Sequence, residues 1–347
     1  MPFTLQELDN IANAALDFHM DRGKVQSQTI QNKPLLRDLR AAQKTFPGGK
    51  ENITVRVKGL YTTQIQGFSG DDEVDYANPA NIKEAAYPWK EIHAGIKVTM
   101  TELKKDGITI TDSATGKGEQ RHSERELTAL ANLLEDKLED MDEGFDRGMH
   151  SMYWRDGTQD AKLVPGVRSF ILNTPTSATI VGGIPQDVNT WWRNRAVLGI
   201  STAAAANQLL VQTLQKEYRQ LRRYGTPNHK FYAGSDLMDW FEQELRAKGN
   251  YTLEGWAKSG TIDASVADIA FKGKTIEYDP QLDDEGLSKY LYVLDMKQIM
   301  PKVMEGEDMK RHNPARPENK YVIYRAMTWT GGLVCRQRNT SGVYSIA

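Results

Sequence analysis

The chain of 347 residues carries 44 lysines and arginines against 46 aspartates and glutamates, a formal net charge of −2, so it lacks the cationic excess of proteins that bind nucleic acid through bulk charge. Its single cysteine excludes an internal disulfide and a cysteine cluster for zinc. No apolar run approaches the roughly 18 to 20 residues of a membrane-spanning helix. The first residues also lack the pattern of a signal peptide, so we expect synthesis in a cytoplasm and no membrane partner.

Residues 1–50 predict a basic arm. Nine basic residues against three acidic ones lie between positions 21 and 58. Within the arm, three leucines at helical spacing predict a short helix from Pro34 to Lys44, ended by "FPGGK". The leucines face away from Arg37 and Arg40, which together with Lys44 are candidate contact residues.

Residues 51–103 predict two strands joined by a broad polar tip. Apolar residues alternate with polar ones in "NITVRVKGLYTTQIQ" and again in "EIHAGIKVTM". We expect these two strands to pair with each other. Because a two-stranded ribbon is marginally stable alone, we expect another subunit to cover it, with Trp89 contributing apolar burial.

The clearest helix runs from Glu119 to Tyr153, where apolar residues recur in steps of three or four. At about 1.5 Å per residue it is on the order of 50 Å long. Its polar face is acidic and includes the candidate contact residues Glu135, Glu139 and Asp142.

From residue 164 to about 318 the pattern changes to shorter mixed elements. We expect a helix from Asn207 to Arg223, the strand "KFYAG", a helix from Ser235 to Lys248, and the strands "KTIEYDP" and "YLYVLDM". This is an α+β unit of ordinary domain size. The last residues, 319–347, are again β-rich.

Patterns that indicate chemistry are sparse. The six histidines are scattered without a pair at i and i+4, so a zinc hydrolase has no motif here. The acidic tip residues Asp71, Asp72, Glu73 and Asp75 leave three interpretations open: a calcium or magnesium site, a solvated loop tip, or a contact with a basic surface of a neighbour such as the arm.

Two further features allow a functional and a structural interpretation. Arg222 and Arg223, with Lys216, Arg219 and Lys230, form a basic patch that fits nucleic acid, but a solvated helix face that pairs with acids across an interface is favoured. Cys335 lies in a β-like run, and a reactive thiol needs a nearby base. We therefore expect a buried apolar residue there. No cofactor is expected.

Three stretches, taken in order, resemble one protein family. "LVPGVRSFILN" followed by "ATIVGGIPQDVNTWWRN" is similar to the entry into that family's axial domain. "IEYDPQLDDEGLSKYLYVLDMKQIM" is similar to its late strand pair, and "MTWTGGLVCRQRNTSGVY" to its closing strand. The family is the major capsid proteins of tailed bacteriophages, the shell proteins with the Hong Kong ninety-seven fold.

The resemblance implies an α+β fold with an N-terminal arm (1–50), an extended two-stranded E-loop (51–103), a P-domain with a long spine helix (104–163), an A-domain (164–318) and closing P-domain strands (319–347). In those last strands Arg336 and Arg338 would reach an interface. The basic arm and the acidic spine helix are complementary in sign, which suits contacts between them.

The function that the resemblance implies is structural, not enzymatic. Copies would assemble as pentamers and hexamers into an icosahedral head in the host cytoplasm and form the virion capsid. The head would enclose double-stranded DNA without sequence specificity. A scaffolding protein and a portal are implied partners, and a decoration protein is compatible with this role.

Three alternatives stay open at this point. A cellular nanocompartment (encapsulin-like) shell would enclose enzymes in place of a genome. A tail or baseplate protein would form rings or tubes. A metal-dependent hydrolase would use the carboxylates Asp71, Asp72, Glu73 and Asp75.

Overall fold

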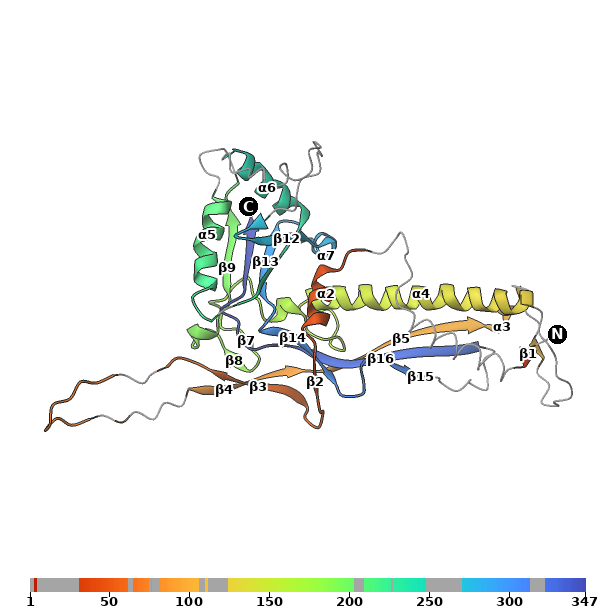
Figure 1. Cartoon of the computed structure of the whole chain (residues 1–347), viewed down its shortest axis with the longest axis horizontal. Coiled ribbons are helices and arrows are strands. Elements are labelled where there is room, and N and C mark those ends of the chain that lie inside the picture. Colours follow the sequence, from red (N-terminus) through yellow and green to blue (C-terminus); the bar gives the residue numbers. More distant parts are fainter. Residues whose placement is uncertain are drawn as a thin grey trace. The chain divides into compact units, whose positions relative to one another are not determined.

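The computed structural model describes residues 3–4, 31–61, 65–74, 76, 81–105, 110–111, 124–202, 209–225, 227–247, 270–312 and 322–347, with the backbone alone at 3–4, 104, 110–111, 124–136 and 246–247. The chain divides into two compact units (Figure 1). The first is made of Met1–Gln31, Glu91–Met149 and Met304–Thr330, and the second of Asn32–Lys90, His150–Val303 and Gly331–Ala347. No helix in the described ranges is both long and apolar enough to cross a membrane.

The first unit combines strands with one long helix. Its elements are β1 (Phe3–Thr4), β5 (Lys90–Thr99), α3 (Met100–Lys105), β6 (Ile110–Thr111), α4 (Glu124–Trp154), β15 (Lys310–His312) and β16 (Val322–Cys335), of which α4 and β16 continue into the second unit. β16 pairs with β5 and with β15, and β1 pairs with β6. Leu138 and Met141 of α4 pack on Ala94 and Ile96 of β5.

Local sequence explains both helices of this unit. At the start of α3, the Glu102 backbone N–H donates to Thr99 Oγ1 (3.2 Å), and the Thr99 N–H donates to the Glu102 carboxylate (2.9 Å). This reciprocal pair is a capping box. The apolar spacing predicted a long helix, and the structure confirms it as α4, which begins at Glu124.

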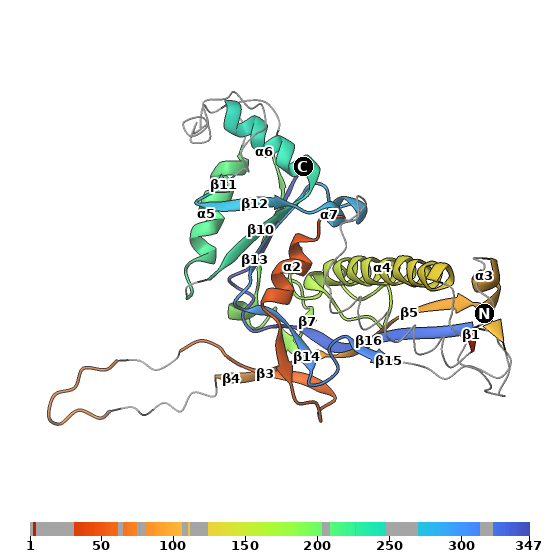
Figure 2. The same ribbon diagram turned by 45° about the vertical axis from the view of Figure 1, so that its right-hand side comes forward.

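The second unit is built around a six-stranded sheet in the order β11-β12-β10-β13-β17-β9. These strands are β9 (Arg195–Ile200), β10 (His229–Ala233), β11 (Ala270–Phe271), β12 (Lys274–Tyr278), β13 (Tyr290–Asp295) and β17 (Gly342–Ile346). Helices α5 (Leu210–Leu221) and α6 (Ser235–Ala247) cover one face (Figure 2). On the other face, the rings of Tyr232 and Tyr292 lie 5.9 Å and 5.1 Å from the ring of Trp154.

Shorter elements surround this sheet. They are α2 (Pro34–Ala41), β2 (Lys44–Phe46), β3 (Asn52–Lys58), β4 (Ile82–Pro88), η1 (Val167–Ser169), β7 (Ile180–Val181), β8 (Ile184–Pro185), η2 (Thr190–Trp192), α7 (Pro280–Asp284) and β14 (Ile299–Met304). β14 pairs with β2 on one side and with the end of β16 on the other. β7 and β8 form a hairpin whose two turn residues, Gly182 and Gly183, both have positive φ, as the favoured two-residue turn requires.

Three expectations about these elements are wrong. β3 pairs with β4, whereas its predicted partner at 91–100 is β5, which pairs with β16. The last strand, β17, was expected to return to the P-domain, but it lies between β13 and β9 in the six-stranded sheet. Helix α2 ends at Ala41, so Lys44 lies in β2. Alternation identifies a strand but not its partner, because every strand offers the same backbone donors and acceptors.

Candidate assembly surfaces

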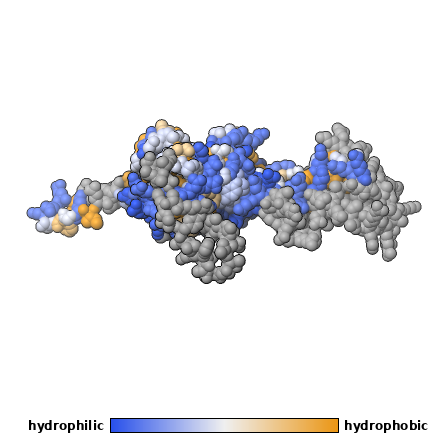
Figure 3. Space-filling view, turned by 90° about the horizontal axis from the view of Figure 1, so that it is seen from above, coloured by the Kyte–Doolittle hydropathy of each residue, from blue (hydrophilic) through white to orange (hydrophobic). Residues whose placement is uncertain are grey.

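β3 and β4 form a two-stranded projection, here called the E-loop ribbon (residues 52–88), which extends from the rest of its unit (Figure 1). Large apolar side chains between its base and its tip are 42 to 102% exposed: Leu60, Tyr61, Ile65, Phe68, Val74, Tyr76 and Ile82. Figure 3 shows apolar atoms on this projection. Grouped apolar exposure of this kind marks an interaction site.

One acidic residue of the tip, Asp72, has a local structural role. Asp71, Asp72 and Glu73 are exposed, and Asp75 lies outside the described residues. The Ser69 backbone N–H donates to Asp72 Oδ2 (2.8 Å), and the Asp72 N–H donates to the Ser69 carbonyl (2.7 Å). Asp72 therefore closes a turn. Across the described residues, no group of three or more His, Cys, Asp and Glu side chains is arranged to hold a metal ion.

The base of the E-loop ribbon is fixed by the segment that carries Gly182, Gly183, Trp191 and Trp192. A Cβ on Gly59 would lie 2.9 Å from Cε2 of Trp191, so only glycine allows this approach. On β4, the Ala86 N–H donates to the Gly182 carbonyl (3.0 Å). Lys83 Nζ donates to Asn189 Oδ1 (2.9 Å). The ribbon thus leaves the unit from a rigid base while its tip stays exposed.

The closing segment packs against the other end of β4. A Cβ on Gly332 would lie 2.6 Å from the Pro88 carbonyl oxygen, which explains one of the twin glycines. Tyr87 Oη donates to the Cys335 carbonyl (2.7 Å). Cys335 is fully buried, and burial raises the pKa of its thiol to about 12, so the expectation of an unreactive buried cysteine is confirmed.

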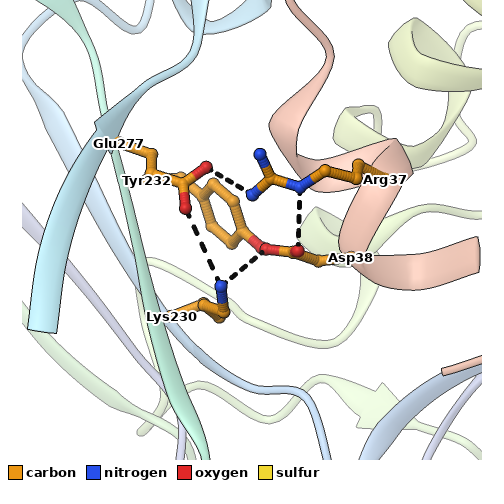
Figure 4. Close-up of polar contacts among 5 residues, drawn as sticks. All are labelled: Arg37, Asp38, Lys230, Tyr232 and Glu277. Atoms are coloured by element: carbon orange, nitrogen blue, oxygen red, sulfur yellow. Dashed lines mark hydrogen bonds and ion pairs between the residues drawn. The ribbon is translucent and has the colours of Figure 1, made fainter. Parts of the chain in front are cut away.

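Helix α2 is held on the six-stranded sheet by a charged network (Figure 4). Arg37 donates to Glu277 Oε2 (2.6 Å) and to Asp38 Oδ1 (3.2 Å), and Tyr232 Oη donates to Asp38 Oδ2 (2.7 Å). Lys230 Nζ lies 3.5 Å from Asp38 and 3.7 Å from Glu277. Arg37, a candidate contact residue of the basic arm, therefore pairs with the sheet of its own unit.

The same network changes the acidity of two groups. Burial acts to raise the pKa of Asp38, but hydrogen bonds from Tyr232 and Arg37 outweigh it and lower that pKa. The pKa of Tyr232 is raised, mainly by burial and to a smaller extent by its hydrogen bond to Asp38. Each exposed ion pair contributes only about 0 to 1 kcal/mol, so the leucines of α2, at most 2% exposed, contribute most to its docking.

Lys44, Lys302 and Arg336 form a cationic cluster on β2, β14 and the residue after β16. Burial, followed by the positive charges of Arg336 and Lys44, lowers the pKa of Lys302. Lys44 and Arg336 are exposed. The structure thus brings two predicted contact residues, Lys44 and Arg336, close to Lys302. Sequence analysis did not single out Lys302, because Lys44 and Arg336 lie far from it along the chain.

Arg338 is not a surface residue, contrary to the expectation. Its side chain is fully buried and donates to the Phe170 carbonyl (2.6 Å), Gln186 Oε1 (3.1 Å) and Asn194 Oδ1 (3.0 Å). Its guanidinium also lies 5.7 Å from the ring of Trp192. Burial lowers its pKa to about 10. Arg338 therefore ties loops together inside the second unit.

The remaining predicted contact residues are scattered. Arg40, Arg222 and Arg223 are exposed, Glu139 and Asp142 are half-buried, and the side chain of Glu135 lies outside the description. Trp89 is half-buried and donates from Nε1 to the Lys50 carbonyl (2.9 Å) within the same unit. The residues that sequence reasoning missed are the exposed apolar ones of the ribbon. Their signal was present as Phe68 and Tyr76 inside an otherwise polar loop.

Comparison with known proteins identifies the fold. No protein-family model matches the chain, and no curated protein matches it by sequence. Among solved structures, the cyanophage A-1(L) capsid asymmetric unit matches with a TM-score of 0.65 at 14% identity, covering 93% of this chain and 94% of that chain. The capsid of a native GTA particle matches at 0.53 and 14%, covering 94% and 95%. The mature capsid of bacteriophage PhiM1 matches at 0.56 and 11%, covering 94% and 90%.

The chain has the Hong Kong ninety-seven capsid fold. This confirms the predicted α+β fold class and explains why a long helix and a projecting ribbon occur together. At 11 to 14% identity the likeness lies in the fold, so the role of the chain depends on the surfaces described above.

Proposed function

We propose that this chain is a non-enzymatic shell subunit that assembles as pentamers and hexamers into an icosahedral phage head around double-stranded DNA. The observation that carries this proposal is the E-loop ribbon, with its exposed apolar side chains on a two-stranded projection. Such a ribbon is marginal alone. Covering one large apolar side chain contributes about 1.5 to 3 kcal/mol, and a second copy of the chain supplies the cover.

Charge gives the E-loop ribbon a place to dock. Asp71 and Glu73 at its tip are exposed anions, and the cluster of Lys44, Lys302 and Arg336 presents two exposed cations, Lys44 and Arg336. A tip cannot reach its own cluster while the ribbon projects from the unit, so we assign the pairing to neighbouring copies. Repetition of one such contact under closed symmetry gives a shell. A scaffolding protein, a portal and a decoration protein belong to the same proposal.

The test is electron microscopy of the purified chain, expressed alone and with its neighbouring genes. We expect closed shells from the natural chain, and free subunits or small rings when two ribbon residues become polar (Phe68→Ser with Tyr76→Ser). The matched control is Ile180→Ser with Val188→Ser, which changes two equally apolar residues, 65% and 75% exposed, outside the ribbon. A natural chain that stays monomeric under every condition contradicts the proposal.

The content of the shells separates a phage head from a cellular nanocompartment. Nuclease-resistant DNA inside shells from the host supports a head, and an enclosed enzyme in place of DNA supports a nanocompartment. The hydrolase alternative predicts activity of soluble monomers that depends on a divalent cation. The use of Asp72 in a turn already gives that cluster a structural explanation.

A further inference from the structure

The six-stranded sheet has one cationic end and one acidic end. Strands β10 and β12 are parallel neighbours, with Phe231 opposite Ile276 and Ala233 opposite Tyr278. Both begin on the α5 side and end on the α7 side, and α5 and α7 lie on opposite sides in both ribbon views (Figures 1 and 2). Five residues of strand separate the two ends by about 16 Å.

The cationic end consists of residues that precede these two strands. Arg222 and Arg223 come before β10, and Lys272 and Lys274 lie in the β11–β12 hairpin. All four are exposed, and none pairs with an acid among the described residues. The ring of Tyr218 packs on Phe271, which holds the hairpin against α5.

Arg222 lies close to a buried histidine of this end, because its guanidinium lies 5.7 Å from the ring of Tyr218 and that ring lies 5.3 Å from the ring of His229. Burial is the main cause that lowers the pKa of His229, the first residue of β10. The hydrogen bond with the Thr340 carbonyl and the charge of Asp295 act in the opposite direction. The charges of Arg222 and Lys274 lower the pKa further, so both lie within electrostatic range of one imidazole.

The acidic end consists of residues that follow the same two strands. Asp236 and Asp239 lie in the first turns of α6, directly after β10, and Asp283 lies in α7, directly after β12. The Ser235 N–H donates to Asp283 Oδ1 (3.0 Å), which joins the start of α6 to α7. Lys289 is an exposed cation at this end, and its Nζ donates to the Ala347 carbonyl (3.0 Å).

We propose that the cationic end of one A-domain docks on the acidic end of the next copy, so that subunits join head to tail into rings. This rests on the proposed shell function and names the contact that closes a pentamer or hexamer. Two different patches on one molecule make a heterologous interface, which closes into a ring when the rotation allows it. Exposed ion pairs are individually weak, so they mainly set orientation and partner choice.

A nucleic acid would use only the cationic end and would leave the acidic end without a role. A second copy of the chain accounts for both ends with one contact. The contact also weakens with salt, because exposed charges are screened over about 8 Å at physiological ionic strength.

Charge reversal with rescue tests the proposal. One variant makes both ends acidic (Arg222→Glu and Arg223→Glu with Lys274→Glu), and another makes both ends cationic (Asp236→Lys with Asp239→Lys). A third carries all five changes, which swaps the two ends but keeps them complementary. Lys162→Glu, in an exposed loop, is the control for altered net charge. Circular dichroism verifies folding, and sedimentation with electron microscopy scores rings and shells.

We expect the acidic variant and the cationic variant each to form at least tenfold fewer rings and shells than the natural chain. The five-residue variant and the control should assemble. A mixture of the acidic and the cationic variants alternates around a ring, so it closes hexamers but not pentamers and yields open sheets or tubes. Variants that assemble like the natural chain overturn the inference and leave the shell function standing. Shells that form from the acidic variant but lose bound DNA overturn it in favour of nucleic acid. A natural chain that forms neither rings nor shells overturns both.

Discussion

Replacement of Asp279 is the substitution that we expect to lower the free energy of unfolding of the second unit most. Its side chain is fully buried, and its oxygens meet three groups: His150 Nε2 at 2.9 Å, Trp154 Nε1 at 2.8 Å and the Gln281 backbone N–H at 3.0 Å. His150 and Trp154 belong to the end of α4, and Gln281 belongs to the first turn of α7. One carboxylate thus joins the end of the long helix to the acidic end of the six-stranded sheet.

The magnitude follows from the three bonds. Loss of an N-cap side chain costs about 1 kcal/mol. A buried indole N–H without a partner costs about 1 to 3 kcal/mol, and a buried imidazole nitrogen costs a similar amount. Because effects of groups in one network do not add fully, we expect Asp279→Ala to lower the free energy of unfolding by about 4 kcal/mol.

The assay is urea unfolding of the unassembled chain, followed by tryptophan fluorescence. Trp154→Phe removes the indole donor, so we expect the variant that combines it with Asp279→Ala to lose about 1 to 2 kcal/mol less than the sum of the single losses. Asp187→Ala is the matched control, because Asp187 is exposed and a surface substitution stays within about 0.5 kcal/mol. A loss below about 1 kcal/mol for Asp279→Ala refutes the reasoning.

Three further changes test the interior of the second unit. Gly332→Ala places a Cβ 2.6 Å from the Pro88 carbonyl and should cost about 1 to 3 kcal/mol in thermal unfolding, whereas Gly67→Ala, with open space around it, should be tolerated. Arg338→Met removes the donor to the Phe170 carbonyl and Gln186 Oε1, whereas Asn194 Oδ1 keeps the Leu172 N–H (3.1 Å), so denaturation should show a loss of about 2 to 4 kcal/mol, and an unchanged midpoint would contradict this role. Cys335 should react with a thiol reagent only after unfolding, and rapid reaction of the folded chain would argue against its burial.

Helices were the most predictable part of the fold, because their signal is local. The apolar spacing of residues 127–152 was enough to predict α4, and the three leucines near Pro34 were enough to predict α2. Strand pairing depends on residues far apart in the chain, which explains the wrong partner for β3 and the unexpected place of β17.

The assembly surfaces were only partly predictable for the same reason. Exposure of Arg222 and Arg223 follows from their place at a helix end, but Arg338 has the same residue type and the opposite environment. Its burial is decided by acceptors from residues 170–194, which no local pattern connects to it. Asp279 and Pro280 were expected to belong to the strand "KTIEYDP", but β12 ends at Tyr278, Asp279 caps α7 and Pro280 is its first residue.

The E-loop ribbon combines a fixed base with an open tip, and this arrangement has a consequence for assembly. A tip that hung from a flexible base would lose conformational freedom when it docked, and that loss would weaken the contact. Here the close approach of Gly59 to Trp191 and the bond from Lys83 to Asn189 fix the base within the folded subunit. The base of the ribbon is therefore already in place before a neighbouring subunit docks. The apolar side chains of the tip can then contribute their burial mainly to the contact itself.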